Sequence, residues 1–148
     1  MKRIKSIIWA IALLMCTTMA MAQNAGDKII GTYKAVQEGK VSKVKISKNG
    51  NGYRAQIIWL AEPNNPDGTP KLDVRNPDKS KRGVRADHIV IIDKVTYKDG
   101  KWTNGKVYDP TKGKNFDVSI KFKDDKTLAV TGSLLVFSKT VYWTKISQ

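Results

Sequence analysis

The sequence predicts an all-β fold, a single antiparallel meander of about eight strands that closes into a barrel. Short segments of alternating apolar and polar residues recur along the chain between turn residues, which is typical of half-buried strands. No segment keeps an apolar period of about 3.6 residues for long enough to predict a substantial helix. Closure into a barrel is expected because it leaves no sheet edge exposed.

The clearest of these segments is a predicted hairpin between Trp102 and Phe116. Asp109 and Pro110 open its turn, because proline is preset for the first central turn position and aspartate can cap the turn through its side chain. Gly113 supplies the positive φ that a short hairpin loop needs. Beyond the turn, apolar residues occupy every second position of residues 116–122, the pattern of a half-buried strand.

Similar patterns predict the remaining strands and one long loop. Strands are expected at residues 31–36, 41–47, 53–61, 89–95, 102–108, 116–123, 128–131 and 140–146. In the third of these, alternation places Trp59 on the same face as Tyr53 and Ile57. The segment from Glu62 to Gly83 is rich in proline, asparagine and aspartate, and loops of this length are usually functional or mobile.

Residues 1–22 are predicted to be a signal peptide, and residues 23–148 the barrel domain. Basic residues at positions 2, 3 and 5 precede an apolar segment at 7–15 and the motif Ala20-Met21-Ala22, as in secretory signals. The apolar segment is shorter than the roughly 20 residues that span a bilayer, so no transmembrane segment is expected after cleavage. The predicted location is the periplasm or the extracellular space. Lipidation at Cys16 is a minor alternative, because Met15 precedes it where lipoprotein signals need a small residue.

Composition excludes some classes of function. Cys16 is the only cysteine, so the mature chain has no thiol for nucleophilic catalysis, thiolate metal binding or redox chemistry. Removing the three basic residues of the signal peptide from the 27 in the chain leaves 24 against 13 acidic residues, a net charge of +11. Such an excess favours anionic surfaces such as lipid head groups, lipopolysaccharide phosphates or acidic glycans. Nucleic acid is not an expected partner, because export separates the protein from it and no recognition motif accompanies the charge.

Three stretches carry a resemblance to a known family. They are Leu72-Asp-Val-Arg-Asn-Pro-Asp78, the hairpin Trp102-x-x-Gly-x-Val-Tyr-Asp-Pro-x-x-Gly-Lys-x-Phe116, and Trp143-Thr-Lys145. On these motifs the mature chain resembles the bacterial domain of unknown function 2147 family over nearly its whole length. The resemblance implies a small exported barrel of lipocalin-like shape with no established activity. The chain departs from the usual pattern at Tyr33, Thr131 and Lys145, where Trp, Arg and Arg are common.

No motif predicts catalysis or a cofactor. The sequence contains no G-x-S-x-G, H-E-x-x-H, P-loop or G-x-G-x-x-G pattern. His88, the only histidine, begins a predicted strand and is interpreted as structural. We therefore expect no catalytic residue, no cofactor and no metal. Asp73, Asn76 and Asp78 carry oxygens suited to a hard cation, but their spacing matches no EF-hand and basic residues surround them, which favours Asx turns.

The predicted site is the 62–83 loop together with the mouth of the barrel beside it. Binding residues concentrate on long loops held by a rigid scaffold. The polar candidates are Asp73, Asn76, Asp78 and Arg82, and the aromatic candidates for a cavity lining are Trp59, Trp102, Tyr108 and Trp143. Two alternatives stay open: the loop carboxylates bond only to the loop's own backbone, and the aromatic residues form a filled core.

Three functions follow from these observations. The leading hypothesis is a non-catalytic envelope protein that holds a small apolar or amphipathic ligand in the barrel. The alternative is a basic surface protein that engages anionic envelope lipids or glycans. An enzyme of unknown type is the third and has the least support in the sequence.

Overall fold

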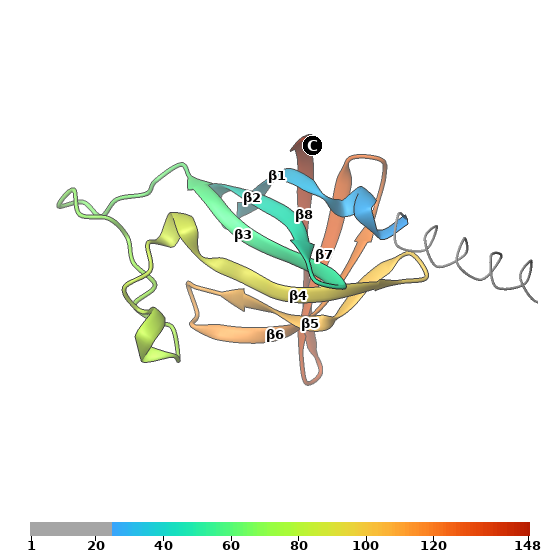
Figure 1. Cartoon of the computed structure of the whole chain (residues 1–148). Helices are drawn as coiled ribbons and strands as arrows, with labels where there is room; N and C mark the ends of the chain where they lie inside the picture. Colours follow the sequence, from blue (N-terminus) through green and yellow to red (C-terminus); the bar gives the residue numbers. More distant parts are fainter. Residues whose placement is uncertain (1–24) are drawn as a thin grey trace, which may run out of the picture.

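The computed structural model describes residues 25–148; the predicted signal peptide and Cys16 lie outside the described residues. Eight antiparallel strands form a closed barrel in which each strand pairs with the next and the last pairs with the first (Figure 1). The predicted all-β meander is therefore confirmed, and so is its closure.

Every predicted strand is present, with somewhat longer bounds in most cases. The strands are β1 (Gly31–Gln37), β2 (Lys40–Asn49), β3 (Gly52–Leu60), β4 (Val90–Lys98), β5 (Lys101–Asp109), β6 (Lys114–Phe122), β7 (Thr127–Leu134) and β8 (Phe137–Ser147). Three single-turn 3₁₀ helices accompany them: η1 (Asp27–Ile29), η2 (Lys79–Lys81) and η3 (Ala86–His88).

The two ends of the barrel are built differently. One end, which we call the mouth, carries the β1–β2, β5–β6 and β7–β8 turns and the long connection between β3 and β4. The opposite end, the base, carries the other turns and η1. Figure 1 shows the long connection and η1 on opposite sides of the barrel. Access to the barrel interior is therefore through the mouth if the base is closed.

The base is closed by the segment around η1. The Trp102 indole nitrogen donates a hydrogen bond of 3.2 Å to the Gly26 carbonyl, and the Tyr33 hydroxyl donates one of 2.8 Å to the Ile29 carbonyl. Trp102 is fully buried and packs edge-on against Phe122, with ring centroids 5.7 Å apart. Large aromatic side chains fill this half of the barrel, and their polar atoms are hydrogen-bonded. This half is therefore a solid core.

Alternation follows the predicted pattern in β2, and register shifts interrupt it elsewhere, among them one in β3 and one in β5 between Trp102 and Gly105. Val44 and Ile46 of β2 are buried, as expected. In β3, however, Ile57 is opposite Val44 while Trp59 is opposite its neighbour Lys43, so one extra residue is inserted between them. This β-bulge reverses the alternation. The expectation that Trp59 faces the interior is wrong, and its side chain is 42% exposed on the outer surface.

The β5–β6 turn has the predicted chemistry. Asp109 Oδ1 accepts hydrogen bonds from the Thr111 amide (2.9 Å) and hydroxyl (2.6 Å), which caps the turn. Gly113 has a φ of 63°, and a Cβ at this position would collide with the Arg75 carbonyl oxygen. The Arg75 guanidinium also donates to the Thr111 carbonyl. The turn is therefore a docking point for the long loop.

Candidate binding site

The barrel wall has two gaps in its mouth half, where neighbouring strands stop pairing. β4 and β5 pair only between residues 96–98 and 101–103. β1 and β8 pair only between residues 32–35 and 143–147. We call the gap between β4 and β5 the filled gap, because the long loop covers it. We call the gap between β1 and β8 the open gap, because a cavity reaches the surface there.

The filled gap is covered by residues 73–78 of the long loop. Asp73 and Asn76 are buried there. The Tyr108 hydroxyl donates a 2.6 Å hydrogen bond to Asp73 Oδ1, and the Asn76 amide donates a 2.8 Å bond to Asp73 Oδ2. The Asp73 amide in turn donates to the Val84 carbonyl at 2.9 Å. Both oxygens of this buried carboxylate are therefore occupied by protein donors.

The remaining polar candidates also bond within the loop. Asp78 Oδ1 accepts hydrogen bonds from the hydroxyl and the amide of Ser80 and so caps η2; these bonds lower the pKa of Asp78. Arg82 Nε donates a 2.8 Å bond to the Asn76 carbonyl. The fold thus brings Asp73, Asn76, Asp78 and Arg82 together, but their contacts are those that order the loop. Their role in binding stays a prediction.

Tyr108 lies between the loop and the barrel interior. The residue borders both the interior cavity and a hollow of about 830 Å³ beside the loop, which Asp73, Asn76 and Asp78 also line. Burial, followed by the hydrogen bond to Asp73, raises the pKa of Tyr108 above its usual range. The hydroxyl is therefore held neutral as a donor, and it joins the loop to β5.

An interior cavity of about 260 Å³ occupies the mouth half of the barrel. It is lined mainly by small or branched apolar side chains from several strands: Ala35, Val44, Ile57, Val130, Val141 and, from the aromatic candidates, Trp143. Gly132 also faces this space, and a Cβ there would meet Phe116 and Val107 at ordinary contact distances of 3.4 and 3.5 Å. Small residues leave open space in the mouth half, whereas aromatic side chains fill the corresponding space at the base.

A second cavity of about 300 Å³ adjoins the first beneath the β1–β2 turn. The two cavities share Gln37, Ser42, Ile57, Asp109 and Pro110 in their linings. Together they reach the size range of roughly 300–1,000 Å³ that ligand pockets occupy. We treat them as one candidate site.

The cavity reaches the surface through the open gap. Val36 of β1 and Phe137 of β8 stand on the two margins of this gap and both border the cavity, although they are 48% and 76% exposed. Two basic side chains, Lys112 and Lys139, also border it. The Lys139 ammonium lies 3.8 Å from Glu38, an exposed pair that holds the lysine only weakly. The site thus combines an apolar interior with a charged entrance, where Lys112 and Lys139 lie near the carboxylates of Asp109 and Glu38.

The structure separates the aromatic candidates into three environments. Trp143 and Tyr108 are part of the cavity lining, and the Tyr108 hydroxyl is bonded to Asp73 of the loop; their role in binding stays a prediction. Trp102 belongs to the solid core at the base, and Trp59 lies outside, where the Lys43 ammonium is 5.0 Å from its ring centroid. Trp59 and Trp102 are therefore not placed to contact a ligand in the cavity.

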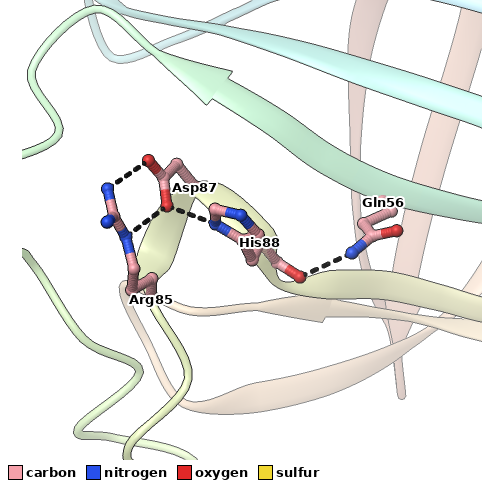
Figure 2. Close-up of polar contacts among 4 residues, drawn as sticks. All are labelled: Gln56, Arg85, Asp87 and His88. Atoms are coloured by element: carbon pink, nitrogen blue, oxygen red, sulfur yellow. Dashed lines mark hydrogen bonds and ion pairs between the residues drawn. The ribbon is translucent and has the colours of Figure 1, made fainter.

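A separate polar cluster surrounds the only histidine (Figure 2). The Arg85 guanidinium donates to both Asp87 oxygens, at 3.1 and 2.9 Å, and His88 Nδ1 lies 2.6 Å from Oδ1. These contacts, with Arg85 first, lower the pKa of Asp87. The His88 carbonyl accepts a hydrogen bond from Gln56. The imidazole is largely exposed, and the bond from Gln56 links the end of η3 to β3.

Sequence reasoning missed the turn between β7 and β8. Residues 134–137, Leu-Leu-Val-Phe, form an apolar run at a position where turns are usually polar. Leu135 is 94% exposed and Val136 is 92% exposed. The run itself was the available signal, because an uninterrupted apolar stretch at a predicted turn breaks the pattern of a soluble surface.

The closed eight-stranded barrel with a cavity near its mouth is lipocalin-like. It is similar to the structure of protein HP1028 from the human pathogen Helicobacter pylori, which is described as belonging to the lipocalin family. The TM-score is 0.67 over 80% of this chain and 83% of that chain, at 24% sequence identity, a likeness that supports the fold alone.

The family is shown by the sequence itself. Residues 31–145 match the model of the family described as "uncharacterized protein conserved in bacteria", domain of unknown function 2147, and the chain belongs to that family. The resemblance predicted from the motifs is confirmed. A comparison with curated proteins gave no match. Among the described residues, no helix combines the length and apolar character needed to cross a membrane, and no cluster of three metal-ligating side chains was found.

Proposed function

We propose that this protein is exported and binds a small apolar or amphipathic molecule in the mouth half of its barrel without catalysing a reaction on it. The observation that carries the proposal is the apolar cavity, which reaches the surface beside a solid core. Protein interiors are usually packed to high density, so an open apolar space of this size leaves contacts unmade that a ligand can supply.

The lining indicates the chemistry of the ligand. Ala35, Val44 and Val130 offer only hydrocarbon surface, which suits an alkyl chain or a similar apolar group. At the entrance, Lys112 and Lys139 suit an anionic or strongly polar head group. The best-fitting class is therefore an amphipathic molecule with an apolar tail and an anionic head. The lipocalin membership of the Helicobacter pylori protein supports this by fold analogy only.

The direct test is to ask whether the protein carries such a molecule. Mature protein purified from the envelope under gentle conditions is expected to show a bound small molecule in native mass spectrometry. After extraction of that molecule, the protein should bind the fluorescent fatty acid cis-parinaric acid, and dodecanoate should displace it. An empty spectrum together with no binding of cis-parinaric acid would contradict the proposal.

The alternative predicted from charge, contact with anionic envelope lipids or glycans, is supported by one specific observation. That observation is the β7–β8 turn, whose apolar residues Leu135 and Val136 are almost fully exposed.

A further inference from the structure

The turn between β7 and β8 ends in an apolar point that nothing in the described chain covers. We call residues 134–137 the hairpin tip. Leu135 and Val136 form its two-residue turn and are almost fully exposed, and Phe137 is 76% exposed. Figure 1 shows the turn extending below β5 and β6 at the end of the β7–β8 pair. Clustered exposed apolar side chains of this kind mark contact sites rather than ordinary surface.

The backbone of the turn adds to its cost in water. Leu135 has a φ of 56°, a left-handed conformation that favours glycine or asparagine and is uncommon for leucine. Two-residue turns normally use Asn-Gly or a similar polar pair. Here both turn positions carry apolar side chains in place of residues that would suit water and the backbone. The combination indicates that the tip contacts an apolar environment when the protein functions.

The tip is continuous with the entrance to the cavity. Phe137 belongs to the tip and also borders the cavity at the open gap. Lys139, two residues further along β8, borders the same entrance. The tip, a basic side chain and the cavity entrance therefore share one side of the molecule.

The occupant that fits these features is an anionic lipid bilayer. A tip of a few residues is too small to supply the roughly 800 Å² per partner that a stable protein interface buries. A narrow convex point is, however, well shaped to enter the boundary between head groups and acyl chains. Its flanking residues Leu134 and Phe137 are paired across the turn, so few backbone groups would lose water on insertion. The net charge of the mature chain, +11 by sequence, favours anionic head groups.

We propose that the hairpin tip inserts into the surface of an anionic membrane. Insertion would bring the open gap to the bilayer, where an amphipathic molecule could pass between the membrane and the cavity. The membrane contact stands independently, and only this exchange of ligand rests on the proposed function. The tip would thus be a docking element that serves the entrance.

The test measures partition of the mature protein onto lipid vesicles by flotation. Vesicles of phosphatidylcholine alone are compared with vesicles that also contain phosphatidylglycerol. We expect binding to the second kind and little to the first. The double variant Leu135→Ser/Val136→Ser should partition onto these vesicles at least about tenfold more weakly. The reason is that each aliphatic side chain contributes strongly to the free energy of transfer from water to an apolar phase. Equal binding by this variant would overturn the proposal.

A matched control removes exposed apolar residues from elsewhere. Leu72→Ser/Val74→Ser changes two exposed residues of the long loop and should leave partition unchanged. A Val136→Trp variant locates the contact, because its fluorescence should shift to shorter wavelength when phosphatidylglycerol vesicles are added. No shift, or binding that does not depend on phosphatidylglycerol, would contradict the assignment. A concentration-dependent dimer that the hairpin variant abolishes, with no vesicle binding, would assign the tip to a second copy instead.

Two further measurements separate this proposal from the cavity proposal. Gly132→Leu, which places a side chain into the cavity, should still bind vesicles even though it binds cis-parinaric acid poorly. Conversely, the hairpin variant should still bind cis-parinaric acid in the absence of lipid. If both variants lose vesicle binding equally, the tip has no separate docking role.

Discussion

The filled gap and the open gap are two solutions to the same break in the barrel wall. Between β4 and β5, the long loop enters with Asp73 and Asn76, which bond to each other and to Tyr108. Between β1 and β8, Val36 and Phe137 border the cavity with apolar side chains. The first gap contains polar groups that are bonded to one another and that also line a hollow beside the loop. The second gap contains the cavity and is bordered by apolar side chains.

The difference shows which polar clusters indicate binding. A buried carboxylate whose two oxygens each accept a bond from a protein donor already has the partners that burial requires, so its burial does not by itself indicate a ligand. Small apolar residues beside an exposed margin leave contacts unmade, and a ligand can supply them. We therefore propose a structural role for the filled gap and ligand binding for the open gap.

The largest expected effect comes from breaking the filled gap. Asp73→Ala would leave the Asn76 amide and the Tyr108 hydroxyl buried without their acceptor. Such a loss costs about 2–4 kcal/mol of unfolding free energy, which corresponds to a fall in Tm on the order of 10 °C. Thermal unfolding followed by circular dichroism measures it. Asp67→Ala, which removes an exposed turn carboxylate, is the control and should change Tm little. An unchanged Tm for Asp73→Ala would show that the loop is not architecture.

The next effect comes from filling the open gap's cavity. Gly132→Leu should weaken binding of cis-parinaric acid about tenfold or more, because the new side chain occupies the space of the ligand. Gly132→Ala adds only a methyl group at ordinary contact distance from Phe116 and should bind almost as well as the parent. Fluorescence titration of both variants measures the difference. Equal affinity of the leucine variant would place the probe elsewhere.

A smaller effect is expected at the entrance. Lys139→Gln should weaken binding of dodecanoate about three- to fivefold, the range of an exposed ion pair, and leave binding of neutral dodecanol unchanged. Lys121→Gln, on an exposed position of β6, serves as the control. Displacement of cis-parinaric acid by each compound gives the affinities. A loss that is the same for dodecanol and dodecanoate would argue against a role for the charge.

The smallest effect is a pH dependence that belongs to the filled gap. The folded protein holds the pKa of Tyr108 above its ordinary value of 10.0, so the neutral hydroxyl is favoured by folding. Its contribution to stability is complete below about pH 10 and is lost as the pH rises further, because the unfolded chain releases the proton first. Urea unfolding at pH 9 and pH 11 should show a smaller decrease for Tyr108→Phe than for the parent. Identical decreases would contradict the assignment to Tyr108.

Much of the fold follows from alternation and turn residues in the sequence, and the β5–β6 turn at Asp109 and Gly113 shows why. Both act through local geometry, which needs no knowledge of distant partners. Trp59 shows the limit, because a single inserted residue in β3 reverses which face it occupies. A bulge depends on the pairing with β2, which periodicity within one strand does not contain.

The candidate site was harder to predict than the fold. The loop was predicted as the binding site because it concentrates polar residues. The sequence does not show that Asp73 accepts hydrogen bonds from Asn76 and Tyr108. The cavity is made by residues such as Ala35 and Gly132, which look like ordinary strand residues until the barrel closes. Only the size of the facing side chains determines whether the interior is filled.

The central claim, that a ligand occupies the open gap and not the loop, is tested most directly by methyl NMR of valine-labelled mature protein. A spin-labelled fatty acid should broaden the methyl signals of Val44, Val130 and Val141 in the cavity. The signals of Val74 and Val84 in the long loop should keep their widths. Broadening confined to the loop valines, or no broadening at any of the five, would contradict the account.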